Sequence, residues 1–367
     1  MIKRKTKIYI FHPYSGVGGA DLSISRLING LNPNKYIIDF ISINKPLIKS
    51  KIKKRINYIG INSSRTFFSF FKIKKYIEDD HSDYQKKIFI SNQNFANVLS
   101  VLFLKNIKNL KIILLERNHL DELKFSIGLL DLFKKKLILK LIKKVYRKAD
   151  RVIGNSLSLS KKLSDYTNLK ILTIYNPCHF SKIYKRKTKQ RNDLLLLNVA
   201  RLEPQKDHLT LLKAVNLIKN KIRFKLVIIG YGSQLLKLKD FIKKNKLNNL
   251  VKIYSTGIDA LKFYKKSDLF ILTSKYEGFP NVLVEAAEHS IPIISTKCNS
   301  GPSEILLNGR GGDLINVGDH QSLATKILFF AKNKALLKKK SIFCKKNLKR
   351  FEFKKNIRKF EEVFDKV

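Results

Sequence analysis

Short apolar runs alternate with helical stretches along almost the whole chain, and this alternation restricts the fold more than any other feature. The runs are rich in Ile, Leu, Val and Phe. Apolar strands separated by helices are typical of parallel sheets covered by helices on both faces. The sequence therefore predicts two doubly wound α/β domains. The strands are expected at residues 8–11, 36–43, 88–91, 111–115 and 151–154 in the first half, and at 194–199, 224–229, 251–254, 269–273 and 292–295 in the second.

A polar and highly charged segment without apolar periodicity separates the two series of strands, at residues 181–192. Such a segment is typical of a linker. We therefore predict a Rossmann-like domain over residues 1–180 and a second over residues 193–345. Apolar side chains recur at helical spacing within residues 346–367, which predicts a final helix that can pack back on the N-terminal domain.

The chain is strongly basic, with 75 Lys and Arg against 28 Asp and Glu and a formal net charge of +47. Nucleic acid would use this charge to neutralise phosphates, and an anionic membrane surface would attract it. A coding bias towards Lys, Ile and Asn would produce the same excess without any function. Because no zinc finger, RNP-type motif or recognition helix is visible, we expect no nucleic-acid partner.

Three widely separated cysteines, Cys178, Cys298 and Cys344, form no CxxC motif and no Cys/His ligand set. Reduced and packed thiols are expected, which suits the cytoplasm. No apolar run reaches the about 20 residues needed to span a bilayer, and the first one is too short for a signal peptide. We predict a cytoplasmic protein, associated peripherally with the inner face of the cytoplasmic membrane.

Residues 272–292 contain two carboxylates, Glu277 and Glu285, in a pattern of strand, loop and helix. Pro280 can sit in the first turn of the helix, whose unpaired N–H groups can hold a phosphate. Gly278 lets the backbone approach a ligand closely. The carboxylates could then receive sugar hydroxyls on either side of the phosphate, although two glutamates at this spacing are also common on solvated surfaces.

Other loops follow strands of the second half in the same way. Arg201 and Lys206 could converge on a diphosphate, Arg as a planar fork and Lys as a point charge, or could be ordinary surface charges. Glycine turns follow the next strands at Gly230, Gly232 and Gly257. Several such loops at one sheet edge are typical of a nucleotide-binding site.

In the first half, a glycine-rich turn that ends at Gly18 and Gly19 follows the first strand. Its spacing lacks the third glycine of the dinucleotide fingerprint, so an NAD site is weakly supported. A tight turn without ligand is an equal alternative. His119 follows a later strand and could position an acceptor or the transferred sugar, or could be satisfied within the protein.

Two basic amphipathic stretches bear on the acceptor. Residues 66–75 place four phenylalanines beside three lysines, and residues 132–147 combine apolar positions with several lysines. Such helices can lie on an anionic membrane. They can also be ordinary domain helices with one buried stripe.

The second half resembles the retaining GT-B glycosyltransferases of family 4, also called group 1. The matching blocks occur in the family's order over residues 198–319, and the glycine turn at 16–19 and the Tyr-Asn-Pro at 175–177 extend the match. Glycine is common in the family where this chain has Asp207 and Ser290. The blocks are NVARLEPQKDHLTLLKAV, VIIGYGSQ, SDLFILTSKYEGFPNVLVEAAEHSIPIIST, SGPSEIL and GGDLINVGD.

The resemblance implies two Rossmann-like domains that face a central cleft. It also implies transfer of a sugar from a nucleotide sugar, with a UDP-hexose or UDP-N-acetylhexosamine favoured, and retention at the anomeric carbon. Arg201 and Lys206 would hold the donor diphosphate, Glu277 the sugar hydroxyls and Glu285 the ribose. The other implied donor contacts are Gly278, Phe279, Pro280, Asn281 and Val282 near the phosphates, Gly18 and Gly19 opposite them, and the turns at Gly230, Gly232 and Gly257.

No DxD-type metal motif is evident, and cations with a helix N-terminus can stabilise a departing diphosphate without a metal. We therefore expect no metal and no cofactor. The acceptor expected by analogy is a lipid-linked saccharide in cell-envelope polysaccharide synthesis. The alternatives are a GT-B enzyme with a soluble acceptor, such as a sugar-phosphate synthase or an epimerase, and a basic nucleic-acid-binding protein.

Overall fold

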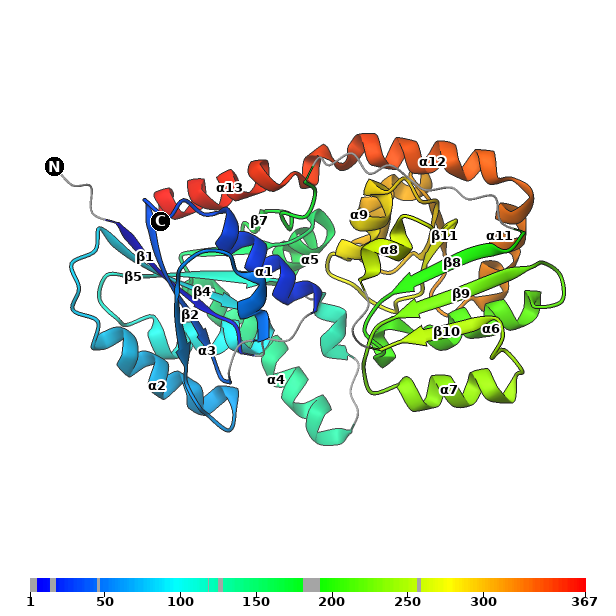
Figure 1. The fold of residues 1–367 in the computed structure, drawn as a ribbon. Coiled ribbons are helices and arrows are strands. Elements are labelled where there is room, and N and C mark those ends of the chain that lie inside the picture. Colours follow the sequence, from blue (N-terminus) through cyan, green and yellow to red (C-terminus); the bar gives the residue numbers. More distant parts are fainter. Residues whose placement is uncertain are drawn as a thin grey trace. The chain divides into compact units, whose positions relative to one another are not determined.

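The chain forms two compact units in the computed structural model (Figure 1). Unit 1 comprises Met1–Pro177 and Phe353–Val367, and unit 2 comprises Cys178–Glu352. The predicted linker lies outside the described residues except for Asn192. The structure describes residues 5–13, 18–44, 47–117, 119–124, 128–180, 192–255 and 259–367.

Unit 1 contains a seven-stranded sheet of order β3-β2-β1-β4-β5-β6-β7, in which every neighbouring pair is parallel. The predicted strands are confirmed. The edge strands β3 and β7 were missed because they are short and only partly buried, so they lack an apolar run. The strands are β1 (Thr6–Phe11), β2 (Tyr36–Ser42), β3 (Asn57–Gly60), β4 (Lys86–Asn92), β5 (Leu110–Glu116), β6 (Arg151–Gly154) and β7 (Leu172–Thr173).

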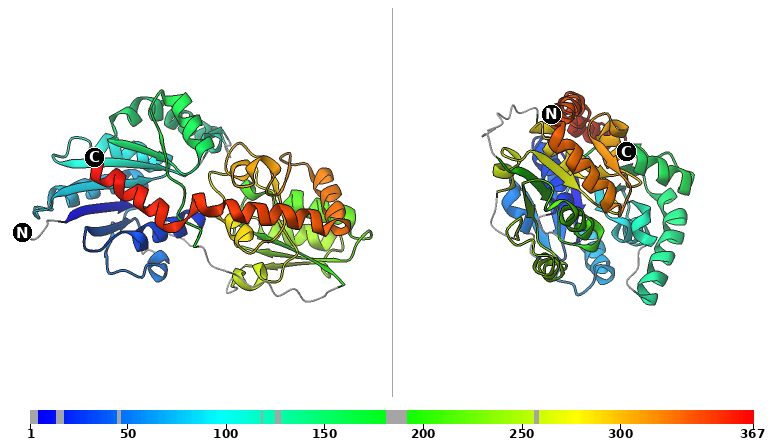
Figure 2. Two further views of the ribbon diagram at one scale, coloured as in Figure 1. Left: turned by 90° about the horizontal axis from the view of Figure 1, so that it is seen from above. Right: turned by 90° about the vertical axis from the view of Figure 1, so that its right-hand side faces the viewer.

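Helices cover both faces of this sheet. Along β1, Ile8 and Ile10 pack with α1 and α13, whereas Tyr9 and Phe11 pack with the helices of the opposite face. The final helix α13 lies against α1 within unit 1 (Figure 2). The helices are α1 (Gly19–Gly30), α2 (Thr66–Glu78), α3 (Asn94–Leu104), α4 (Leu129–Val145), α5 (Leu157–Thr167) and α13 (Phe353–Lys366), with short 3-10 turns η1 (Leu47–Lys51), η2 (Leu120–Lys124) and η3 (Tyr146–Lys148).

Unit 2 contains a six-stranded parallel sheet of order β10-β9-β8-β11-β12-β13. Its predicted strands are confirmed, and β13 is an additional short edge strand. The strands are β8 (Leu194–Val199), β9 (Phe224–Ile229), β10 (Val251–Tyr254), β11 (Leu269–Leu272), β12 (Ile293–Thr296) and β13 (Asp313–Ile315). The helices are α6 (His208–Ile218), α7 (Leu235–Lys244), α8 (Ala260–Tyr264), α9 (Asn281–Glu288), α10 (Pro302–Ile305), α11 (His320–Lys332) and α12 (Lys334–Lys346), with η4 (Pro204–Lys206), η5 (Leu307–Gly309) and η6 (Asn347–Phe351).

The end of the chain is not one helix over residues 346–367. Helix α12 of unit 2 ends at Lys346, and α13 of unit 1 begins at Phe353. Between them Glu352 is extended, with φ −57° and ψ 137°, and forms a β-bridge with His179. This pairing interrupts the helical repeat, which sequence periodicity alone does not reveal.

Both sheets reverse their strand order in the middle, between β1 and β4 in unit 1 and between β8 and β11 in unit 2. Loops beyond the carboxyl ends of the strands at such a point are where open α/β sheets bind ligands. In unit 2 these are the loops of residues 200–207 and 273–280, which carry the predicted donor residues. Within the described ranges, no helix is long and apolar enough to cross a membrane.

Candidate active site

Lys206 and Glu277 form a close ion pair at the carboxyl edge of the unit 2 sheet. The Lys206 Nζ lies 2.6 Å from Oε1 of Glu277, and the two side chains are only 14% and 7% exposed. Ser274 donates its hydroxyl to the same Oε1 at 2.6 Å. Among the described residues, none donates a hydrogen bond to Oε2 of Glu277, so this oxygen remains available to a hydroxyl of a ligand.

Side-chain and backbone hydrogen bonds hold the two loops of this ion pair together. Gln205 donates its Nε2 to the carbonyl of Tyr276 at 2.8 Å, and the amide of Lys275 donates to the carbonyl of Gln205 at 2.8 Å. Thr273 donates its hydroxyl to the carbonyl of Lys206 at 3.1 Å. The loop after β8 and the loop after β11 therefore form one braced structure.

The block SGPSEIL supports this structure from behind. Ser300 donates its hydroxyl to the carbonyl of Glu277. Gly301 has a φ of +75°, and a Cβ atom there would lie 2.6 Å from Cδ of Pro280 and 2.9 Å from the carbonyl oxygen of Gly278. Only glycine accommodates both the left-handed backbone and this close approach, which explains the glycine of the block physically.

Helix α9 begins directly after the braced turn. Pro280 is its N-cap, not a residue of the first turn as predicted, because the helix starts one residue later. Glu285 lies farther along α9, where Tyr264 donates its hydroxyl to Oε2 at 3.1 Å. Phe279 packs edge-on against Phe351, with ring centroids 4.9 Å apart, so its side chain belongs to the core and only its backbone can meet a ligand.

Asn281 and Val282 open α9, the first buried and the second half-buried. Their amides belong to the first turn, where backbone N–H groups lack helical partners. Together with Gly278, Phe279 and Pro280, these two residues form the predicted phosphate-binding backbone, which directly follows Glu277 in the chain.

The glycine turn after β9 packs against the loop that carries Arg201. A Cβ atom at Gly230 would lie 1.8 Å from the carbonyl oxygen of Ala200, and Gly232 has a φ of +152°. The Glu203 carboxylate accepts hydrogen bonds from the amide and the hydroxyl of Ser233, at 3.1 and 2.7 Å. Both glycines thus permit a close contact between two loops.

Arg201 itself is exposed, and its Nη2 is 3.5 Å from Oε1 of Gln205. This contact is long, so most donors of the guanidinium face solvent and can bind an anion. Gly257, the third predicted glycine turn, lies outside the described residues.

His208 lies next to this loop and was not singled out from the sequence. It is buried, and neither ring nitrogen has a hydrogen-bond partner. Burial, together with the nearby Lys206 cation, lowers the pKa of His208 to about 4. The imidazole is therefore neutral at physiological pH.

The corresponding edge of unit 1 carries a different arrangement. Gly18 is the N-cap of α1, and its amide donates to Oδ2 of Asp21 at 2.8 Å. Oδ1 of Asp21 is 3.0 Å from Nε2 of His12. The Gly18 amide is thus already bonded within the protein, and Gly19 is the first residue of the helix. The predicted role of both glycines towards donor phosphates stays a prediction.

A buried network surrounds Arg117, directly after β5. Its Nε donates to Oδ1 of Asn92 at 2.9 Å, and its Nη1 donates to Oδ1 of Asn176 at 3.0 Å and to the hydroxyl of Ser23 at 2.5 Å. Burial lowers the pKa of Arg117 to about 10, so the guanidinium stays charged at neutral pH. The sequence signal was available, since Asn92 ends one strand and Arg117 follows the next.

His119 lies in the turn that follows, buried, with Nδ1 2.9 Å from Oδ2 of Asp121. The ring is held in place by this pair, in agreement with the alternative of a histidine satisfied within the protein. Its predicted role towards a sugar stays a prediction. Glu116, just before Arg117, is fully buried against Asn97 and Tyr146, and burial raises its pKa to about 8.

The cysteines are free and buried, as predicted. Burial raises the pKa of the Cys298 thiol to about 12, which makes it unreactive. In the part of the chain that the structure describes, no three His, Cys, Asp or Glu side chains gather as a metal site requires. Independence from metal remains a prediction.

Comparisons with known proteins show which sequences and folds this chain resembles. Residues 180–350 match the family model of the glycosyl transferases group 1. An uncharacterised glycosyltransferase of Methanocaldococcus jannaschii is 29% identical over 307 residues, which cover 77% of this chain and 73% of that protein. A Campylobacter jejuni α-1,4-N-acetyl-D-galactosaminyltransferase, whose name refers to a saccharide on PP-undecaprenol, is 24% identical over 322 residues, 84% of each chain.

A solved structure extends the likeness to both units. HepE of Anabaena, in complex with UDP-glucose, aligns with a TM-score of 0.80 at 18% identity, covering 98% of this chain and 100% of that one. At this identity the likeness shows the fold alone. Residues 180–350 thus match the group 1 glycosyl transferase model, and the two units have the fold of the GT-B glycosyltransferases.

Proposed function

We propose that the protein is a retaining glycosyltransferase that moves a hexose or N-acetylhexosamine from a UDP-sugar to a lipid-linked saccharide in cell-envelope polysaccharide synthesis. The observation that carries the proposal is the braced pair of Lys206 and Glu277, with one carboxylate oxygen bonded and the other open. A site built to recognise a hydroxyl discriminates strongly, because its buried polar group is unpaired without that hydroxyl.

Each part of the site has a role in this reaction. Oε2 of Glu277 accepts a hydroxyl of the donor sugar, while Lys206 and Ser274 hold the carboxylate in place. An ammonium group has three donors, so Lys206 can contact Glu277 and a diphosphate oxygen at the same time. Arg201 supplies the second cation.

The step that needs stabilisation is departure of the nucleoside diphosphate, which builds negative charge on its oxygens. Lys206, Arg201 and the first amides of α9 offer fixed positive charge and dipoles to that group. These groups can perform the task without a metal, and we propose that the enzyme needs none. Glu285, held by Tyr264, would bind the ribose.

The lipid-linked acceptor is supported by one relative and one surface. The Campylobacter jejuni relative is named after a saccharide on PP-undecaprenol. In unit 1, the helices α2, α3 and α4 lie on the same side of the sheet (Figure 1) and expose large apolar side chains. We propose that this face, which we call the α2–α4 face, docks on an anionic membrane.

The α2–α4 face combines apolar and basic groups. On α4, Leu129, Leu130 and Phe133 are 86%, 89% and 72% exposed, an unusual loss of apolar burial for a helix in water. On α2, Phe68 and Phe71 are also exposed. Lysines flank both sets, as in helices that lie in a membrane interface.

A panel of nucleotide sugars tests the donor. Thermal stabilisation and slow hydrolysis should single out one UDP-sugar, and transfer to a lipid-linked saccharide should proceed unchanged in the presence of a chelator. NMR of the product should show the anomeric configuration of the donor. A strict requirement for added divalent ion, or an inverted product, would contradict this part of the proposal.

Liposome flotation tests the α2–α4 face. Replacing Phe68, Leu129 and Phe133 with serine should abolish binding to anionic vesicles. The control replaces Leu236 and Phe329, which are exposed on unit 2, and should bind as the parent does. Equal binding by both variants would show that net charge alone is responsible. Lys72 is left unchanged in these variants. Its Nζ donates to the carbonyls of Ile61 and Asn62, so its replacement would also disturb the structure of unit 1.

A further inference from the structure

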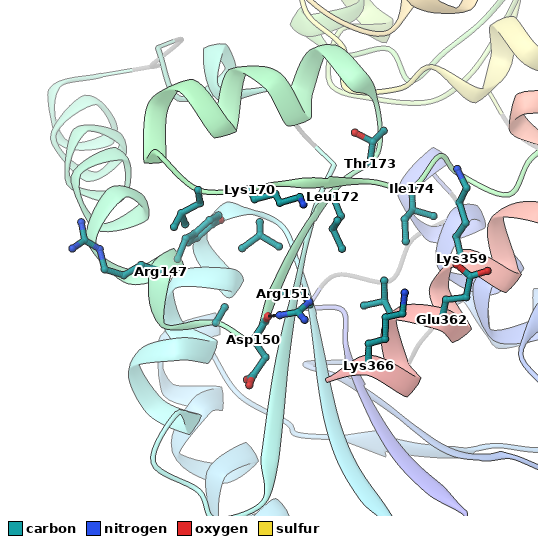
Figure 3. Close-up of a pocket in the computed structure, with 15 residues that line it drawn as sticks. Arg147, Asp150, Arg151, Lys170, Leu172, Thr173, Ile174, Lys359, Glu362 and Lys366 are labelled. Carbon is teal, nitrogen blue, oxygen red and sulfur yellow. Dashed lines mark hydrogen bonds between the residues drawn. The ribbon is translucent and has the colours of Figure 1, made fainter.

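Unit 1 contains a pocket of about 660 Å³ that lies outside the candidate active site. It is bounded by η3, β6, β7 and α13, and we call it the α13 pocket (Figure 3). Its volume falls within the about 300–1,000 Å³ typical of small-molecule sites. Arg151, the first residue of β6, lines it, so it lies towards the amino ends of the strands, whereas the candidate active site lies at their carboxyl ends.

The short edge strand β7 leaves this space open. It pairs with β6 only at Ile153 and Gly154, so the start of β6 has no strand beside it on that side. Helix α13 approaches from the neighbouring sheet face, where Leu172 packs against the hydrophobic cluster that includes Val363. The pocket therefore results from a sheet edge that neither a strand nor a helix covers.

Apolar side chains form part of the lining. Val152, Ile174 and Val363 are buried and Leu172 is partly buried around the pocket. This apolar surface suits a hydrocarbon portion of a ligand, and it distinguishes the pocket from a simple patch of surface lysines.

The lining also includes five cationic residues. Arg151 extends from β6, and Lys359 and Lys366 extend from α13, while Arg147 points away (Figure 3). Lys170 adds a further charge. Among the described residues, none of these five side chains forms an ion pair with a carboxylate.

The two acidic residues of the lining do not balance these charges. Asp150 is already bound by Lys105 and Lys111, at 3.3 and 3.5 Å, and by the amide of Ile112 at 2.9 Å. Glu362 alone remains, on the exposed face of α13. Arg151 donates its Nη1 to the carbonyl of Asp150 at 2.6 Å, which leaves its positive charge without a carboxylate partner. Cations of this kind around an apolar pocket favour a ligand that has an anionic head and an apolar tail.

We propose that the α13 pocket binds an anionic amphiphile, namely a phosphate-bearing headgroup attached to an apolar chain. The headgroup contacts Arg151 and Lys366, and the chain lies against Val152, Leu172 and Val363. Such a ligand joins α13 to the edge of the sheet and holds the end of the chain in unit 1. This binding is separate from the proposed transfer reaction and does not require it.

Titration calorimetry with dihexanoyl phosphatidic acid, kept below its micelle concentration, tests the proposal. The full-length protein should bind it saturably at one site. Arg151→Ser with Lys366→Ser should weaken binding by about tenfold or more, because two charge-assisted contacts are lost. The matched control, Lys354→Ser with Lys355→Ser, removes two exposed charges from α13 outside the pocket and should change affinity by less than about twofold.

Two further ligands distinguish the contribution of the headgroup to binding from that of the apolar chain. Inorganic phosphate should bind much more weakly than the lipid, and dihexanoyl phosphatidylcholine, whose headgroup carries no net charge, should also bind weakly. In hydrogen exchange, the phosphatidic acid should slow amides of α13, β6 and β7 and leave unit 2 unchanged. Equal affinity for phosphate or for the neutral lipid, equal weakening by the control variant, or protection that avoids α13 would each overturn the proposal.

Discussion

The two units share a sheet topology but fill the same topological position with different chemistry. In unit 2 the loops after β8 and β11 meet through a cation and a carboxylate, with one carboxylate oxygen left open. In unit 1 Arg117, directly after β5, donates to Asn92 at the end of β4 and to the neutral acceptors Ser23 and Asn176, so several guanidinium donors are used internally. We call the unit 2 edge the open edge, because a carboxylate oxygen there can bind a ligand. We call the unit 1 edge the closed edge, because the donors of its arginine are bonded within the protein. The same fold thus allows both arrangements.

Each unit also contains a buried ionisable group, and burial shifts the pKa values of these two groups in opposite directions. In unit 1 burial raises the pKa of Glu116 to about 8, and in unit 2 burial lowers the pKa of His208 to about 4. Each group is neutral where it is buried, as the energetic penalty for burying a charge requires. We therefore expect Glu116 and His208 to change the stability of their units with pH in opposite directions.

The largest effect is expected at the open edge. Lys206→Ala or Glu277→Ala should each lower the rate of sugar transfer by about 10²–10³-fold, because a preorganised electrostatic contact is lost. Lys275→Ala removes an exposed lysine of the same loop and should leave the rate nearly unchanged. Steady-state kinetics on folded variants checks this, and a loss of less than about tenfold for both Lys206 and Glu277 would contradict the assigned roles.

The second effect is expected at the closed edge. Arg117→Met should destabilise unit 1 by about 3 kcal/mol, because Asn92, Ser23 and Asn176 lose the hydrogen bonds from the guanidinium. Arg147→Met, at an exposed position, should change stability by less than about 0.5 kcal/mol. Hydrogen exchange resolved by unit measures both. If Arg117→Met leaves unit 1 as stable as before but reduces transfer, this edge is also a ligand site and the contrast fails.

The third test uses pH. Relative to an unfolded value of 4.5, the raised pKa of Glu116 means that unit 1 should lose stability as pH rises from about 4.5 to about 8. Glu116→Gln should remove this slope, whereas Glu78→Gln on exposed α2 should retain it. The stability of unit 1 can be measured by hydrogen exchange at several pH values between about 4.5 and about 8.

Unit 2 should show the reverse. The pKa of His208 is about 4 in the folded protein and 6.5 in the unfolded chain. Unit 2 should therefore lose stability as pH falls from about 6.5 to about 4. His208→Leu should abolish this acid sensitivity. Parallel pH slopes for the two units would refute the opposition between them.

The smallest effect concerns backbone strain. Ser290 has a φ of +53°, and an L-residue in this region costs about 1 kcal/mol. Ser290→Gly should therefore stabilise unit 2 by up to about 1 kcal/mol, whereas Thr325→Gly inside α11 should destabilise it by a similar amount. Thermal unfolding distinguishes these signs, and a destabilised Ser290→Gly would show that the serine has a role of its own.

The sequence predicted most of what depends on local pattern. The apolar runs gave the long strands, and the order of motifs gave the loops that carry Lys206 and Glu277. Asp207 and Ser290, the positions where glycine is common in the family, both have positive φ in the structure, 47° and 53°. This backbone conformation is the physical reason that glycine suits them.

Partnerships between distant side chains could not be predicted in the same way. The contact of Lys206 with Glu277 spans 71 residues, and the network of Arg117 joins four separate segments, so the sequence places the residues at strand ends but does not show which side chains pair. The break at Glu352 depends on pairing with His179, and the short strands β3 and β7 lack an apolar run. Each of these features is set by packing in three dimensions.

Hydrogen exchange with and without UDP tests most directly the central claim that unit 2 holds the donor. UDP should slow exchange in the segments of residues 201–206, 230–235 and 274–286 of the parent protein and of Lys275→Ala, and should do so much less in Lys206→Ala. Protection in these segments that survives Lys206→Ala undiminished, or protection confined to unit 1, would contradict the account.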